Sequence, residues 1–350
     1  MIFKSEKVNF VKKLFILLMF GLVGIWATYF NMACTSKSPS APNFQSPLQT
    51  VVAINPTWTA TPTSTNTPVP PSPTPTGSPT PFVTNTWVGF NAPSGVAVDS
   101  SGNVYVADTG NNAVKKYTSG GVLVTSWGDG GKGKGKISFT TPKGVAVDSA
   151  GILYVVGSGT NGVNQYDAFG NLLAQFTNAN GITFAGPQGV AVDSANNVYV
   201  SDTGNNRIVK MNSSGAPISI FGTNGVISQA VTFYGLGLDS IGDAAVACGD
   251  NQIRFFNSTT GSAGITIPGF NGPGGIAFDS GNNLYVADAG NHQIEEFLSG
   301  PGLVQSPINI FNGGGQLMSP KGIAIVGAGA QAGTLCVADP AGTRIFVFAP

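Results

Sequence analysis

The stretch from Pro93 to Tyr117 reads PSGVAVDSSGNVYVADTGNNAVKKY, and the fold follows from it. The apolar run Val96–Val98 ends at Asp99, and a polar turn then leads into the run Val104–Val106. A second polar turn leads into a third run. Glycine and asparagine stand in both turns, where the backbone needs positive φ. The stretch therefore predicts a β-meander of three antiparallel strands.

The same pattern recurs along the chain. Glycine followed by an apolar, a small and an apolar residue and then Asp occurs five times, and a sixth copy has Val326 in place of Asp. A period of about 40–50 residues with about four short strands is typical of a propeller blade. We therefore predict an all-β, six-bladed β-propeller over residues 82–350. The six glycines, which are 49, 45, 46, 40 and 47 residues apart, are Gly95, Gly144, Gly189, Gly235, Gly275 and Gly322.

The third copy is the most complete, and it reads PQGVAVDSANNVYVSDTGNNRI from Pro187 to Ile208. It resembles the NHL repeat, and the resemblance covers residues 86–350. The resemblance implies a mostly six-bladed propeller family. In each copy, we expect the glycine before the first strand to let backbones crowd near the propeller axis. We expect the aspartates to be turn residues, with Asp202 pairing with Arg207 or with backbone.

The ring is expected to close through its N-terminal end. The chain ends at what corresponds to the third strand of blade six, so a fourth strand is missing there. Residues 86–93 match residues 266–273 in register, and the latter form an outer strand that leads into blade five. We therefore predict that residues 84–90 are the outer strand of blade six, which removes an exposed sheet edge.

Residues 1–34 are predicted to be a signal peptide or membrane anchor. Four lysines precede an uncharged, mostly apolar run from Leu14 to Phe30. A small residue followed by Cys34, just after the apolar run, resembles a bacterial lipoprotein signal. The resemblance implies lipidation of Cys34, although Asn31 stands where that signal usually has Leu. An uncleaved anchor and an ordinary signal peptide stay open. All three place the rest of the chain outside the cytoplasm, in the cell envelope or the extracellular space.

Residues 35–81 are predicted to be a disordered linker rich in Pro, Thr and Ser. Twelve of the 23 prolines fall in this segment. Such a sequence cannot bury a core, and proline keeps it extended. We interpret it as a semi-rigid stalk, whose composition also suits O-glycosylation.

Candidate binding residues are sought where the copies differ. The residue before each repeat glycine is expected on one face, around the centre of the ring. These residues are Ser94, Lys143, Gln188, Tyr234, Gly274 and Lys321. Further out on that face we expect Asn112, Asn161, Asn206, Asn251, His292 and Thr343. From these rings and the adjoining turn we predict the binding residues Lys143, Gln188, Tyr234, Lys321, Arg207 and His292. A solvated rim without a ligand remains an alternative.

Catalytic and metal sites are not predicted. The single histidine, His292, cannot supply the histidine-held zinc of the amidating lyase that this repeat type resembles. Gluconolactonase-like propellers hold calcium with Glu and Asn or Asp, but the only propeller glutamates, Glu295 and Glu296, are neighbours on a strand and face opposite ways. A triad through His292 is not expected, because that residue stands in a turn. We predict no metal and no cofactor, and an enzyme is the less favoured class.

Nucleic acid is also not expected as a partner. Residues 82–350 contain eight Lys and three Arg against thirteen Asp and two Glu, a net charge of −4, which is the wrong sign for phosphate. The cluster Lys132, Lys134 and Lys136 alternates with glycine and is interpreted as a solubilised loop. Cys248 and Cys336 are expected to be buried free thiols.

The sequence therefore favours an exported, membrane-tethered, monomeric propeller that binds a protein, peptide or glycan at the cell surface. The alternative is a metal-dependent, lactonase-like enzyme with a site in the central channel. A purely structural envelope module is a third hypothesis.

Overall fold

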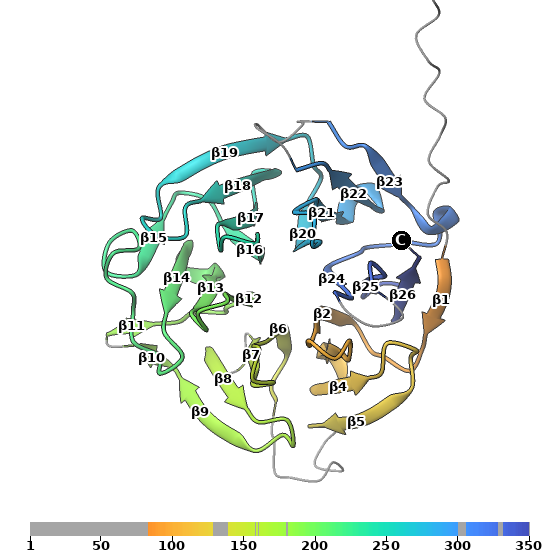
Figure 1. The fold of residues 1–350 in the computed structure, drawn as a ribbon, viewed down its shortest axis with the longest axis horizontal. Coiled ribbons are helices and arrows are strands. Elements are labelled where there is room, and N and C mark those ends of the chain that lie inside the picture. Colours follow the sequence, from red (N-terminus) through yellow and green to blue (C-terminus); the bar gives the residue numbers. More distant parts are fainter. Residues whose placement is uncertain are drawn as a thin grey trace, which may run out of the picture. The chain divides into compact units, whose positions relative to one another are not determined.

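The computed structural model describes residues 83–128, 139–157, 159, 161–179, 181–299, 306–327 and 332–349. These residues belong to one compact unit, Pro73–Pro350. They form six four-stranded antiparallel sheets arranged as a ring (Figure 1). The predicted six-bladed propeller is confirmed. The predicted signal segment, the linker up to residue 81 and the cluster Lys132, Lys134 and Lys136 lie outside the described residues.

Each blade runs outward from an inner strand that lines the axis. Blade one contains β2 (Pro93–Val98), β3 (Val104–Asp108), β4 (Ala113–Tyr117) and β5 (Leu123–Trp127). Blade two contains β6 (Pro142–Val147), β7 (Leu153–Gly157), β8 (Gly162–Tyr166) and β9 (Leu172–Phe176). Blade three contains β12 (Gly189–Val192), β13 (Val198–Asp202), β14 (Arg207–Met211) and β15 (Val226–Ser228). A short hairpin, β10 (Asn178–Ala179) and β11 (Ile182–Thr183), precedes blade three.

The second half of the ring repeats this order. Blade four contains β16 (Phe233–Leu238), β17 (Ala244–Cys248), β18 (Gln252–Phe256) and β19 (Ala263–Pro268). Blade five contains β20 (Pro273–Phe278), β21 (Leu284–Asp288), β22 (Gln293–Phe297) and β23 (Asn309–Phe311). Blade six contains β24 (Gly322–Ile325), β25 (Leu335–Asp339), β26 (Arg344–Phe348) and, from the other end of the chain, β1 (Val83–Trp87).

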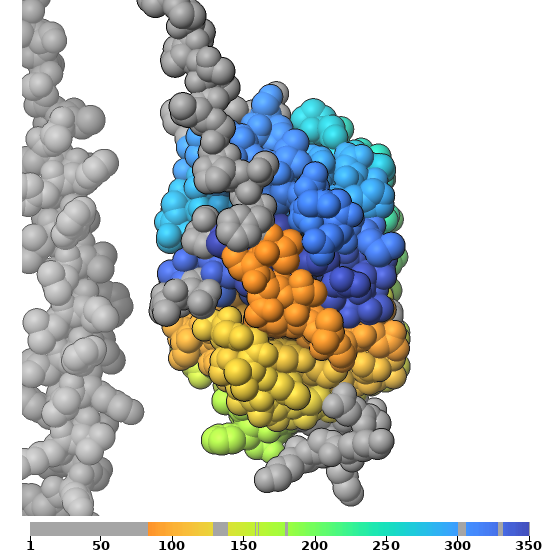
Figure 2. Space-filling model, turned by 90° about the vertical axis from the view of Figure 1, so that its right-hand side faces the viewer, coloured from red at the N-terminus to blue at the C-terminus, as the bar shows by residue number. Residues whose placement is uncertain are grey.

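Strand β1 closes the ring. It pairs antiparallel with β26, with Trp87 opposite Ile345 and Val83 opposite Phe348. The hydroxyl of Thr84 also donates to the carbonyl of Val347 at 3.0 Å. Figure 2 shows this orange segment between the blue C-terminal strands and the yellow strands of blade one. The predicted closing strand is confirmed, starting one residue earlier and ending at Trp87.

The blades are held together by apolar surfaces packed face to face. Tyr105 and Trp127 of blade one, for example, belong to the same buried cluster as Leu153 of blade two. Burial of each large apolar side chain of this kind stabilises the folded state by about 1.5–3 kcal/mol relative to leaving it exposed to water. Cys248 and Cys336 are buried free thiols, as predicted. Within the described residues, no helix has the length and apolar character needed to cross a membrane.

The inner strands approach one another closely because glycine stands near the start of each. A Cβ built on Gly322 of blade six would overlap the carbonyl oxygen of Ser94 in blade one. A Cβ on Gly95 would overlap the carbonyl oxygen of Lys143 in the same way. Because backbone cannot move aside like a flexible side chain, these positions require glycine. The predicted crowding at the axis is confirmed.

This crowding generates a stability prediction. The substitution Gly322→Ala should lower the free energy of unfolding by about 1–3 kcal/mol, because the new methyl group forces blades six and one apart. The control Gly327→Ala should change it by less than about 0.5 kcal/mol, since a Cβ there meets no atom within 4 Å. Urea unfolding of the two variants measures the difference. Equal effects would show that the axis tolerates side chains.

Candidate functional site

A buried aspartate ends the second strand in four of the six blades and fixes the link before the first strand. Asp108, Asp202, Asp288 and Asp339 are fully buried. Their carboxylates accept hydrogen bonds of 2.7 to 3.0 Å from link amides of the same blade. The donors are the amides of Asn91, Ala185, Asn271 and Ser319. The aspartates are therefore scaffold residues, as predicted. They hold the links, which are the segments just before each first strand, and we call the face of the ring where the links lie the link face.

Arg207 belongs to this scaffold. Its Nε lies 2.7 Å from the carboxylate of Asp202, and a second guanidinium nitrogen donates to the carbonyl of Thr183. Lys115 plays the same part in blade one, 2.7 Å from Asp108. The predicted pairing of Asp202 with Arg207 is confirmed. Arg207 does not line the central pocket, and its binding role stays a prediction.

Four of the six polar residues of the outer ring connect neighbouring blades through their side chains. All six members have φ between 44° and 64°, a left-handed conformation that asparagine tolerates better than most residues. The side-chain oxygens of Asn112, Asn161 and Asn251 accept hydrogen bonds of 2.8 to 2.9 Å from amides in the next blade's link. The Nδ1 of His292 contacts the carbonyl of Met318 in the link before blade six. His292 thus lies outside the central pocket.

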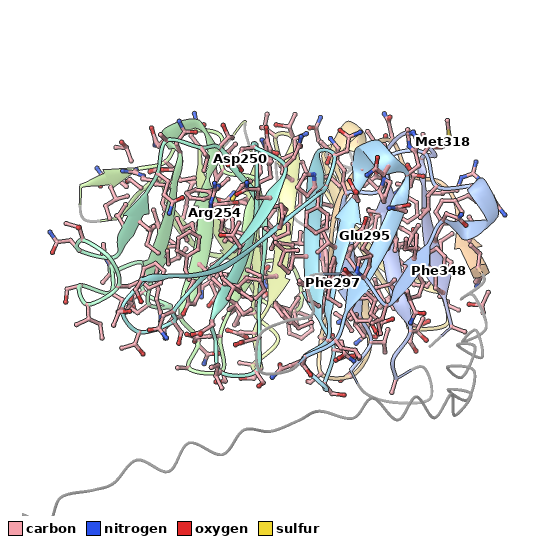
Figure 3. All side chains as sticks on the ribbon, turned by 90° about the horizontal axis from the view of Figure 1, so that it is seen from above. Asp250, Arg254, Glu295, Phe297, Met318 and Phe348 are labelled. Atoms are coloured by element: carbon pink, nitrogen blue, oxygen red, sulfur yellow. The ribbon has the colours of Figure 1, made fainter. Side chains whose placement is uncertain are left out.

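The links and the turns after the second strands share one face. Asp250 belongs to the turn after a second strand, β17, and Met318 belongs to the link before β24. In the side view, both residues lie along the same edge of the ring (Figure 3). Turns between the first and second strands lie at the opposite face. There, Asp99 accepts from the amides of Ser101 and Asn103 at 3.0 and 2.9 Å, which confirms its predicted role as a turn residue.

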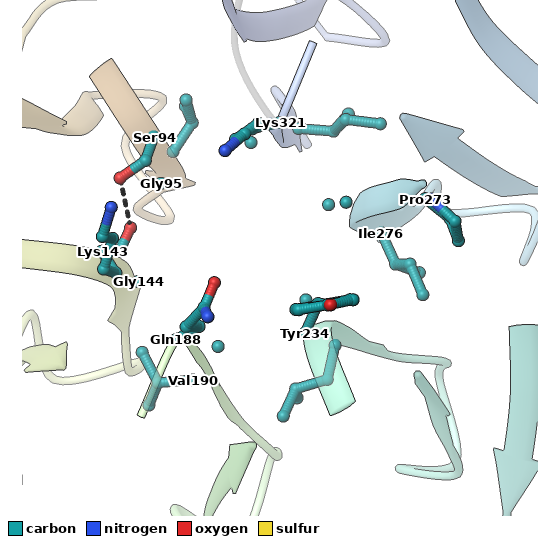
Figure 4. Close-up of a pocket in the computed structure, with 18 of the residues that line it drawn as sticks. Ser94, Gly95, Lys143, Gly144, Gln188, Val190, Tyr234, Pro273, Ile276 and Lys321 are labelled. Atoms are coloured by element: carbon teal, nitrogen blue, oxygen red, sulfur yellow. Dashed lines mark hydrogen bonds between the residues drawn. The ribbon is translucent and has the colours of Figure 1, made fainter. Parts of the chain in front are cut away.

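On the link face, the inner strands surround a central pocket of about 610 Å³. Its outer tier consists of the six residues that precede the repeat glycines: Ser94, Lys143, Gln188, Tyr234, Gly274 and Lys321. Its inner tier, which we call the apolar collar, consists of Val96, Val145, Val190, Leu236, Ile276 and Ile323. Figure 4 shows Lys143, Gln188, Tyr234 and Lys321 around one open space. The outer tier is the ring of residues predicted from the sequence, whereas the collar was not predicted.

Two lysines give the pocket its charge. Lys143 is half-buried and Lys321 is exposed. Burial lowers the pKa of Lys143, and the positive charge of Lys321 lowers it further. Among the described residues, five other cations pair with aspartates, whereas neither pocket lysine has an acidic partner. The lining contains no carboxylate, imidazole or thiol. The pocket is therefore a concave site with uncompensated positive charge.

Sequence comparison identifies the repeat unit. Residues 90–117, 184–211 and 270–297 match the model of the NHL repeat, and they fall in blades one, three and five. The chain is a six-bladed propeller that carries NHL repeats. No curated protein is significantly similar to it in sequence.

Solved structures share the fold at low identity. A catalytically inactive virginiamycin B lyase from Staphylococcus aureus, solved with quinupristin, is 16% identical with a TM-score of 0.52, covering 74% of this chain and 80% of the lyase. A gluconolactonase from Xanthomonas campestris is 13% identical with a TM-score of 0.56, covering 78% and 95%. A chain of a nidogen/laminin complex is 16% identical with a TM-score of 0.54, covering 66% and 84%. Enzymes and a protein of a binding complex thus share this architecture.

Not every outer-tier residue of the NHL propeller offers a free polar group. The hydroxyl of Ser94 donates to the carbonyl of Lys143 at 2.9 Å and lies 2.6 Å from the hydroxyl of Thr109. Ser94 therefore holds the backbone that carries Lys143 (Figure 4). Gly274 has no side chain to offer a ligand, and its backbone lies against that of Lys321. The side chains left for a ligand are those of Lys143, Gln188, Tyr234 and Lys321.

The glutamates of blade five do not contribute to the pocket. Glu295 accepts from the amide of Gln293 at 2.7 Å, while Glu296 accepts from Tyr285 at 2.9 Å and Asn309 at 2.7 Å. They use different partners, as expected for neighbours on a strand. Burial raises the pKa of Glu295. No group of three or more His, Cys, Asp or Glu in the described parts of the chain could hold a metal ion.

The buried aspartates generate a second prediction. Asp202→Ala should cost about 3–5 kcal/mol of unfolding free energy, because it leaves Arg207 and a link amide without their partner. The control Asp250→Ala removes the more exposed Asp250–Arg254 pair and should cost less than about 1 kcal/mol. Thermal and urea unfolding measure both. Similar costs would contradict the assigned role of the buried carboxylate.

Proposed function

We propose that this NHL propeller is an exported binding module that recognises a protein, peptide or glycan on the link face. One observation carries the proposal. The position before each repeat glycine holds Ser, Lys, Gln, Tyr, Gly or Lys, whereas the flanking positions are nearly the same in all copies. All six variable positions line one pocket. The repeated residues build the fold, and among the varied ones Lys143, Gln188, Tyr234 and Lys321 have side chains free for a ligand.

The N-terminal sequence supports export. The lysines before the apolar run Leu14–Phe30 suit translocation, and Cys34 suits a lipid anchor. The Pro-rich residues 35–81 would then hold the propeller away from the membrane as a stalk. A monomer bound to the envelope in this way presents its pocket to partners outside the cell.

The metal-dependent enzyme is the less supported function. A gluconolactonase and a lyase share the fold, but at 13% and 16% identity they share the fold alone. Zinc is held by imidazole, thiolate or carboxylate groups, and calcium sites in proteins combine carboxylate with carbonyl oxygens; the pocket lining contains no carboxylate, imidazole or thiol and carries two lysines. The residues present therefore do not fit a metal, and we derive no reaction from one.

A four-residue variant tests the binding function. Lys143→Met, Gln188→Ala, Tyr234→Ala and Lys321→Met should together lower binding on glycan and peptide arrays at least about tenfold, because they remove the free polar groups of the pocket. The full chain, purified in mild detergent, is the protein to use.

The matched control changes four exposed serines of the opposite face, Ser100, Ser149, Ser194 and Ser280, to Ala. This control should bind like the unchanged protein. If the pocket variant keeps its full binding while the control also binds, the pocket is not the binding site.

A further inference from the structure

We propose that the central pocket recognises an organic acid: a small ligand, or the end of a larger one, that places a single acidic group between Lys143 and Lys321. The inference rests on the proposed binding function and names the chemistry of its ligand. The acidic group could come from an acidic sugar or from an amino acid, and the two sources share this chemistry.

The two lysines come from different blades, with one blade between them. Lys143 lies in β6, Lys321 directly precedes β24, and Ser94 of blade one stands between their backbones. Figure 4 shows both side chains at the rim of the same opening. Holding two like charges at a concave, partly buried site is unfavourable. An anion bound between them offsets both charges and receives charge-assisted hydrogen bonds.

Two neutral polar groups complete the rim. The side-chain amide of Gln188 and the hydroxyl of Tyr234 also line the pocket, and Gln188 and then Tyr234 follow Lys143 around the opening (Figure 4). In the described part of the chain, neither group has a hydrogen-bond partner in the structure, whereas the hydroxyl of Ser94 has three. These groups can therefore bind hydroxyl or amide groups next to the acid.

The size and lining of the pocket point to a small ligand. A volume of about 610 Å³ lies within the range of about 300–1,000 Å³ that small-molecule sites occupy. Below the polar rim, the apolar collar lines the pocket with the small exposed parts of side chains that are otherwise buried between blades. A sugar ring or a single amino-acid side chain suits a pocket of this size with a polar rim and a narrow apolar lining.

The charge of the whole propeller argues against a polyanion. Residues 82–350 carry a net charge of −4, and five of the described cations are already paired with aspartates. Nucleic acids and similar chains need an extended array of free cations. Two unpaired lysines at one point instead match one acidic group.

Calorimetric titration of the full chain with matched compounds tests the inference. The first series is glucose, glucuronate and glucose 6-phosphate, and the second is N-acetylphenylalanine and its amide. In at least one series, the acid should bind about tenfold or more tightly than its neutral counterpart, as charge-assisted hydrogen bonds provide. Raising NaCl from about 0.05 to 0.5 M should weaken the binding of the acid and leave the binding of the neutral compound unchanged. The series that responds identifies the source of the acid.

Variants assign the effect to the two lysines. Lys143→Met with Lys321→Met should abolish the preference for the acid, and Lys143→Arg with Lys321→Arg should retain most of it. The control Arg254→Met with Arg344→Met removes the same charge outside the pocket lining and should keep the preference. Thermal unfolding verifies that each variant is folded, and the arginine variant keeps the test valid if the methionine variant does not fold.

The outcomes separate this inference from the proposed function. No binding of any acid up to about 10 mM, or equal binding of acid and neutral compound, overturns the inference. Retention of the preference in the methionine variant also overturns it. If array binding still depends on the four pocket residues in those cases, the binding function stands without the acid. If the acid binds, but the four-residue pocket variant binds the arrays like the unchanged protein, the inference stands and the proposed recognition surface is wrong.

Discussion

A buried carboxylate at the end of the second strand holds the backbone of the link before the first strand. Asp202 shows this arrangement fully: it is completely buried and accepts from the Ala185 amide at 2.7 Å and from Arg207 at 2.7 Å. A carboxylate in such a place must be paired, since a lone buried charge is costly. The same contact recurs in blades one, five and six. Because it fixes the link in these four blades, it also fixes where Ser94, Gln188, Gly274 and Lys321 enter the pocket.

Two further constraints bring these four links and the links of blades two and four together into one site. The glycines at the axis let neighbouring inner strands approach, so that Gly95 faces the carbonyl of Lys143 without a side chain between them. Strand β1 then pairs with β26 and closes the ring. With these constraints satisfied by repeated residues, the outer tier is free to vary, and its variation places two unpaired lysines beside Gln188 and Tyr234. The structure thus separates residues that build the propeller from residues that give it a chemical character.

The sequence predicts the fold well because the same pattern of glycines, apolar runs and polar turns recurs in six copies. The closing strand follows from the match of residues 86–93 with residues 266–273, and the outer tier follows from the register of the glycines. Other features depend on distances between blades, which no single repeat encodes. The sequence alone therefore did not predict the hydrogen bonds from Asn112 and Asn251 to the next blade, or the contact of Ser94 with the Lys143 carbonyl. The proximity of Lys143 and Lys321, 178 positions apart in the chain, likewise emerges only after the ring closes.

The central claim is that two lysines share the pocket mouth with no acid to neutralise them. The pKa of Lys143, measured by NMR titration of ¹³C-labelled lysine in the unliganded protein, tests this most directly. The account predicts a pKa below the ordinary range of lysine, because burial and the charge of Lys321 both disfavour the protonated form. It also predicts that Lys321→Met raises this pKa partway, since burial remains. A pKa at or above the ordinary value, or one that does not respond to Lys321→Met, would contradict the account.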